Sequence, residues 1–224
     1  MKPSGGCTPV FGRCQQNGPC PGVQRIQRQG MREEEAKSDM ADYITTYSGV
    51  HFVPTEPEQD AIHIRDIAHA LSMICRGNGH VKTFFSVGQH CIYCALEAEA
   101  RGYSARTILA CLLHDASEAY MSDVPRPFKK HLKGYKELEE RLLEVIYAKY
   151  LDRPLTEEEK SHIKQIDDDL LYYDLLELLN EPSEGEPPVL KSEISYRVEP
   201  FEEIEQRYLA LFWKYYHVTV QSPT

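Results

Sequence analysis

The sequence has no long hydrophobic run, no excess of positive charge and no internal repeat. No stretch approaches the roughly 18 consecutive apolar residues of a membrane-spanning helix, so we expect no membrane span. The formal net charge is −10, which argues against general affinity for duplex nucleic acid, because such binding needs a basic surface. An acidic protein can nevertheless bind a small anion through a local group of Arg and Lys side chains.

The amino-terminal segment lacks the features of both a targeting signal and a folded domain. No apolar region follows Lys2, so we expect no secretory signal, and the seven cysteines then predict reduced thiols in a cytoplasmic protein. Residues 1–39 are rich in Gly, Pro, Gln and Arg without any helical or strand period, which predicts a disordered extension. Cys7, Cys14 and Cys20 have no fourth partner at zinc-finger spacing, which favours a plain tail over a metal site.

Residues 40–220 predict one domain of the all-α class, an irregular helical bundle preceded by a short hairpin or arm. The hairpin is expected within 43–54, where aromatic and β-branched residues flank Ser48-Gly49. Apolar periodicity, a possible N-cap at Ser104 and a capping box formed by Thr156 and Glu159 predict the helices. They are expected from about 62 to the turn at 76–79, and at about 84–100, 104–120, 135–150, 156–179 and 201–216. Pro-rich loops are expected at 125–127 and 181–199.

The residues that carry chemistry are His90, the adjacent pair His114-Asp115, and Asp167, each placed inside a predicted helix. Adjacent helical residues point about 100° apart, so His114 and Asp115 reach one metal ion only at the rim of their helix. Imidazole with carboxylate suits a divalent ion such as Mn, Co, Fe, Ni or Zn. Ordinary structural roles compete with this hypothesis, because helical His residues are commonly capped or solvated. Asp167 also belongs to a run of three aspartates that would suit a solvated face.

Two further acidic residues strengthen the metal hypothesis. Glu118 follows His114 by four residues and Asp115 by three, so all three share one predicted helix face. A carboxylate there could accept a proton from a water molecule beside the metal. Asp123 follows in the next turn.

Positive side chains lie on both sides of the acidic group in sequence. Arg76 precedes it in a Gly-rich turn, and Lys129 follows it in VPRPFKK. Phosphate transfer needs cations of this kind to offset developing charge. The competing interpretation is that Lys129 and its neighbours Arg126 and Lys130 only solubilise a loop.

Three stretches carry a family resemblance: IRDIAHALSMICRGNGHVKTFFSVGQH, LLHDASEAYMSDVPRPFKK and IKQIDDDLL. They resemble HD-domain phosphohydrolases related to bacterial 5′-deoxynucleotidase and to viral and prophage dNTP triphosphohydrolases, over about residues 43–180. The resemblance implies one divalent ion bound by His90, His114, Asp115 and Asp167. It also implies that Glu118 positions or activates water, that Asp123 lines the pocket, and that Arg76 and Lys129 bind the phosphate.

Several alternatives stay open at this stage. The family includes enzymes that release phosphate from (deoxy)nucleoside monophosphates and enzymes that release triphosphate, and the 43–80 stretch looks closer to the second group. The ligand is Asp168 rather than Asp167 if the register shifts by one residue. A phosphodiesterase on cyclic or oligonucleotides and a non-catalytic nucleotide-sensing module are the alternative functions. The resemblance implies a homo-oligomer, and Cys91 and Cys94, one helical turn apart, are interpreted as buried packing thiols.

Overall fold

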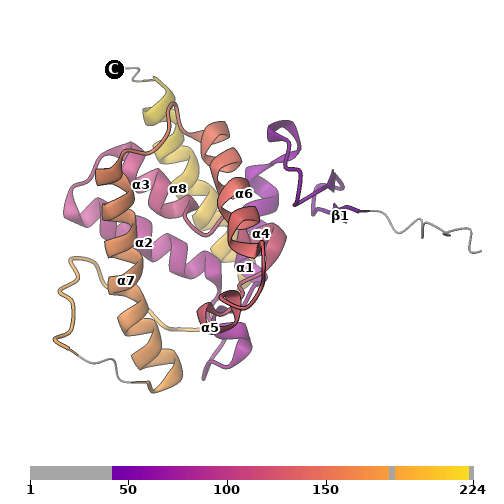
Figure 1. Ribbon diagram of the computed structural model, residues 1–224. Coiled ribbons are helices and arrows are strands. Elements are labelled where there is room, and N and C mark those ends of the chain that lie inside the picture. Colours follow the sequence, from indigo (N-terminus) through magenta and orange to yellow (C-terminus); the bar gives the residue numbers. More distant parts are fainter. Residues whose placement is uncertain (1–41, 182–184, 222–224) are drawn as a thin grey trace, which may run out of the picture. The chain divides into compact units, whose positions relative to one another are not determined.

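The computed structural model describes residues 42–181 and 185–221, and helices dominate them (Figure 1). The predicted extension 1–39 lies outside the described residues. The longer helices are α1 (Ile64–Met73), α2 (Val87–Arg101), α3 (Ala105–Leu113), α6 (Tyr135–Tyr150), α7 (Glu157–Leu179) and α8 (Phe201–Gln221). Two short helices, α4 (Glu118–Met121) and α5 (Arg126–Lys129), lie between α3 and α6. The prediction of an all-α fold is confirmed.

The predicted hairpin is present in short form. Strand β1 (Ile44–Thr45) pairs antiparallel with β2 (His51–Phe52). Gly49 lies in the connecting turn with φ of 82°, a conformation that glycine adopts without steric cost. The turn is held against α1, because the Ser48 backbone N–H donates to the carboxylate of Asp66 at 2.7 Å.

Side-chain caps fix where the longer helices α2, α3 and α7 begin. Ser104 accepts a hydrogen bond from the Thr107 backbone at the start of α3, and Thr156 forms the predicted capping box with Glu159 at the start of α7. A second capping box, Ser86 with Gln89, opens α2. The expected start of that helix at Phe84 is therefore three residues too early.

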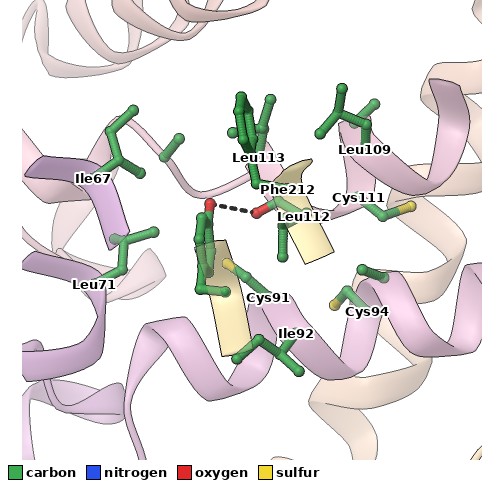
Figure 2. Packing of buried hydrophobic residues seen from close by; sticks show 14 of the residues in the cluster. Ile67, Leu71, Cys91, Ile92, Cys94, Leu109, Cys111, Leu112, Leu113 and Phe212 are labelled. Atoms are coloured by element: carbon green, nitrogen blue, oxygen red, sulfur yellow. Dashed lines mark hydrogen bonds between the residues drawn. The ribbon is translucent and has the colours of Figure 1, made fainter. Parts of the chain in front are cut away.

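The core lies where α1, α2, α3 and α8 pack against one another. Figure 2 shows part of it, with Cys91 and Cys94 of α2 and Cys111 of α3 among buried Leu and Ile side chains. Tyr208 of α8 is fully buried and its hydroxyl donates to the carbonyl of Leu112 at 2.8 Å. This bond holds α8 against the last turn of α3, and His114 is the first residue after that helix.

Two predictions about the chain after α3 are wrong. His114 and Asp115 were expected inside a helix reaching Tyr120, but α3 ends at Leu113 and residues 114–117 form a turn. Bonds from Ala116 N–H to Leu113 O and from Glu118 N–H to Asp115 O span three residues rather than four, which tightens the chain there. The loop expected around Pro125 and Pro127 contains the short helix α5, because proline is accepted in the first turn of a helix.

The chain between α7 and α8 is non-helical over 185–200, as its Pro and Gly content predicted. Within 42–181 and 185–221, no helix combines the length and the apolar character needed to cross a membrane.

Gly88 marks a close approach of α1 and α2. A Cβ atom at Gly88 would lie 3.2 Å from the backbone of Leu71 and Ser72. We expect Gly88→Ala to lower the free energy of unfolding by about 1–3 kcal/mol, because overpacking against backbone outweighs the gain in helix propensity, at most about 1 kcal/mol. Urea unfolding measures this change, and an unchanged or higher midpoint would show that α1 can move aside.

Candidate metal centre

Four predicted side chains come together from three elements. His90 projects from α2, His114 and Asp115 from the turn after α3, and Asp167 from α7. Asp167 Oδ1 lies 3.2 Å from His90 Nε2 and 3.7 Å from His114 Nε2. Asp115 Oδ2 lies 3.2 Å from His114 Nε2, and the two imidazole centroids are 5.3 Å apart.

The neighbours of His114 determine which of its nitrogens carries a proton. Its Nδ1 lies 2.7 Å from the carbonyl oxygen of Cys111, which can only accept, so Nδ1 carries the hydrogen. In a neutral imidazole the lone pair is then on Nε2. This atom is buried and has no hydrogen-bond partner within the described part of the chain, although the carboxylates of Asp115 and Asp167 are close. A lone pair facing two carboxylates requires a proton or another cation between them.

His90 is oriented in the same way by a residue that sequence reasoning missed. Its Nδ1 donates to Asp174 Oδ2 at 3.0 Å, which leaves Nε2 facing Asp167. Carboxylates commonly hold metal-binding imidazoles by the nitrogen that does not bind the metal. Asp174 lies seven residues after Asp167, two helical turns along the same face of α7, and this spacing was a signal in the sequence.

The electrostatics of the site favour a cation. Burial alone would lower the pKa of His90, and so would Arg76, but hydrogen bonds to Asp167 and Asp174 raise it well above its ordinary value. Burial would raise the pKa of Asp115, yet the nearby His114 lowers it to about 2. The donor set of two imidazoles and two carboxylates, with an unpartnered buried Nε2 atom, fits a borderline divalent ion.

Two buried thiols lie beside the imidazoles. Potential ligand atoms of His90, Cys94 and His114 lie within 4.8 Å of one another, and so do those of Cys91, His114 and Asp115. Cys94 Sγ is 3.5 Å from His90 Nε2. Burial raises the pKa of the Cys91 thiol, which keeps that sulfur in its neutral, weakly binding form. A neutral Cys91 thiol is a weaker ligand than the ionised carboxylate of Asp115.

The structure distinguishes Asp167 from its neighbour. The Asp167 side chain is 21% exposed and faces both imidazoles, whereas that of Asp168 is 43% exposed and pairs with Lys164. Arg126 donates to Asp167 Oδ2 at 2.9 Å and lies 3.6 Å from Asp168. Arg126, for which a solubilising role was the competing interpretation, thus contacts a predicted ligand.

Glu118 is the buried carboxylate next to this group. It is the first residue of α4, only 6% exposed, and its Oε2 atom has no hydrogen-bond partner among the residues that the structure describes. Burial, together with Asp115 and Asp123, raises its pKa well above the ordinary value, although Arg76 and Lys129 act in the opposite direction. A carboxyl group with a raised pKa and a free oxygen is a candidate for proton transfer.

The two predicted phosphate-binding cations are placed differently. Arg76 is mostly buried and pairs with Asp174 at 3.1 Å and with Asp115 at 3.6 Å. It therefore contacts one of the four clustered side chains directly. Lys129 pairs with Glu139 at 2.7 Å and lies over the ring of Tyr135. The charge of Lys129 opposes the rise in the pKa of Glu118, but its ammonium group donates its hydrogen bond to Glu139.

Two open hollows of about 580 and 790 Å³ lie along the 185–200 segment. They are lined by Arg101, Tyr103, Lys191 and neighbours, and by Tyr173, Leu190, Tyr196 and neighbours, respectively. Neither is lined by the four clustered residues or by Glu118, so they are separate from the candidate metal centre.

Comparison with known proteins gives relatives without an assigned activity. No protein-family model matches the chain. The uncharacterized protein YfdR of Escherichia coli strain K12 is 43% identical over 109 residues, covering 48% of this chain and 58% of that protein. The uncharacterized protein RCAP_rcc00048 of Rhodobacter capsulatus is 37% identical over 100 residues, covering 42% of this chain and 51% of that protein. The chain thus matches little more than half the length of either curated relative, and it is similar to proteins whose names state no function.

Proposed function

We propose that this chain is a metal-dependent phosphohydrolase of the HD-domain type that acts on small nucleotides, with deoxynucleotides as the expected substrates. One observation carries the proposal. Two imidazole Nε2 atoms and two carboxylates converge beside a mostly buried Arg76 and a buried Glu118 whose Oε2 atom has no hydrogen-bond partner among the described residues. Each of these groups has a role in hydrolysis of a phosphate ester, and a purely structural cluster would not need the free oxygen of Glu118.

His90, His114, Asp115 and Asp167 would hold the ion. A divalent ion bound there supplies Lewis-acid stabilisation of a phosphate oxygen and lowers the pKa of water. Glu118 orients the attacking water and accepts its proton, and its raised pKa suits that exchange. Arg76 neutralises charge on the phosphate, and Asp123, whose charge helps to raise the pKa of Glu118, is the expected second acidic residue of the site. Lys129 joins Arg76 only if its pair with Glu139 opens when the anion binds.

A substrate panel tests the proposal. Purified protein is incubated with each dNMP and dNTP, with ribonucleotides and with cyclic nucleotides, in the presence of Mn²⁺, Co²⁺, Fe²⁺, Ni²⁺ or Zn²⁺. We expect phosphate or triphosphate to appear with at least one deoxynucleotide, and its identity distinguishes nucleotidase from triphosphohydrolase activity. Cleavage of cyclic nucleotides alone would indicate a phosphodiesterase, and nucleotide binding without cleavage would indicate a sensing module. Light scattering on the same sample measures the expected homo-oligomer.

A further inference from the structure

Asp174 connects three functional parts of the molecule. Its Oδ2 atom accepts from His90 Nδ1 at 3.0 Å and from Arg76 Nη2 at 3.1 Å. Its Oδ1 atom accepts from the hydroxyl of Tyr196 at 3.0 Å. Asp174 is only 5% exposed, and burial alone would raise its pKa, but His90, Arg76 and Tyr196 lower it below the ordinary value. Both oxygens of the carboxylate therefore accept hydrogen bonds, three in all.

The third donor, Tyr196, comes from the non-helical 185–200 segment, which is tied to α2 along its length. Glu97 of α2 is fully buried and accepts from the backbone N–H groups of Lys191 and Ser192 at 3.0 and 2.8 Å. Tyr93, one turn earlier on α2, donates to the carbonyl of Ser195 at 3.2 Å. These bonds fix the backbone that leads into Tyr196, so the segment presents its hydroxyl at a defined place.

The segment is also tied to α7, but by a bond that does not reach Asp174. Tyr173, the residue before Asp174, donates its hydroxyl to the carbonyl of Pro188 at 2.7 Å. Tyr173 and Tyr196 therefore each make one hydroxyl bond between α7 and the 185–200 segment. Only the Tyr196 bond continues to His90, which makes the pair a matched comparison.

We propose that Asp174, held by Tyr196, is a positioning residue that fixes His90 Nδ1–H and Arg76 so that His90 Nε2 is free to bind the metal. An imidazole that donates to a carboxylate is held in one tautomer and is a more basic ligand through its other nitrogen. Because Arg76 shares the same carboxylate oxygen, the metal ligand and the phosphate-binding cation keep a fixed separation. The inference rests on the metal site of the proposed function and not on hydrolysis.

The test is a titration of the metal-free full chain with Co²⁺, followed by visible absorption, in Asp174→Asn, Tyr196→Phe and Tyr173→Phe variants. We expect Asp174→Asn to weaken Co²⁺ binding by about 10–100-fold, the range for loss of a partner of a metal-binding His. Tyr196→Phe should weaken it by a smaller factor in the same direction, and Tyr173→Phe should leave it unchanged. Nitrogen NMR of labelled histidine gives a second readout, because the Nδ1–H signal of His90 should shift in the first two variants and stay in place in the third.

Two results would overturn the proposal. One is Co²⁺ binding by Asp174→Asn within about twofold of the unsubstituted protein. The other is equal weakening by Tyr173→Phe and Tyr196→Phe, which would assign the effect to general loosening of the segment. If Asp174→Asn does not fold, as circular dichroism would reveal, the two Tyr→Phe variants still decide the question. An absence of nucleotide hydrolysis in every variant would count against the proposed function but not against this role of Asp174, since the readout is metal binding.

Discussion

Glu118→Gln should bind metal and nucleotide normally while its turnover falls by about 10²–10⁴, the usual contribution of a general base. Glutamine keeps the size of the side chain but cannot accept a proton. Glu118 is buried, one of its oxygens has no partner among the described residues, and Asp115 and Asp123 help burial to raise its pKa. A buried carboxyl oxygen without a partner lowers the stability of the fold, so it is unexpected for a purely structural residue, but it suits a residue that exchanges protons.

Steady-state kinetics and nucleotide binding on the same preparation measure this effect. Glu137→Gln is a suitable control, because Glu137 is an exposed carboxylate in the first turn of α6. A Glu118→Gln variant with near-normal turnover in added Mn²⁺ or Co²⁺ would show that Glu118 does not accept the proton.

Asp167→Asn should lose the bound metal. Asp167 Oδ1 is the carboxylate oxygen near both imidazoles, 3.2 Å from His90 Nε2 and 3.7 Å from His114 Nε2. Burial alone would raise the pKa of Asp167, but the neighbouring imidazoles of His114 and His90 lower it far below the ordinary value, so the group is ionised. Loss of a direct ligand should exceed the 10–100-fold effect of losing a supporting partner. Elemental analysis after dialysis against metal-free buffer measures the loss.

Asp168→Asn is the matched control for that experiment. It removes the same charge one residue away, from a side chain that pairs with Lys164 at the surface. We expect full metal content and unchanged turnover. If Asp168→Asn lost the metal and Asp167→Asn kept it, the proposed set of metal ligands would be incorrect.

Much of the fold follows from local sequence patterns. Thr156 with Glu159 and Ser104 with Thr107 are short-range signals, so the starts of α7 and α3 could be predicted closely. The end of α3 could not, because the chain from His114 to Ser117 contains no proline or glycine to mark it. Tertiary contacts decide that the helix stops there, and no local pattern shows them.

The same distinction applies to the candidate site. His90, His114, Asp115 and Asp167 were recognisable as a group, and the structure brings them together. Asp174 was visible only through its two-turn spacing from Asp167. Tyr196 gave no signal, because it lies in a segment without periodicity whose position depends on distant bonds to Glu97 and Tyr93. The pairing of Lys129 with Glu139 likewise depends on how α5 and α6 meet.

The point at which α3 ends sets the chemistry of His114. The last four carbonyl groups of a helix have no intrahelical partner, and in α3 these include the carbonyl of Cys111. The side chain of His114 turns back to satisfy it, so the histidine caps its own helix through Nδ1. The partial negative charge at a helix C-terminus then lies next to the imidazole and favours a positive ion there. Were α3 to continue by one more turn, Asp115 N–H would take that carbonyl and His114 would lose the contact that directs its Nε2 atom.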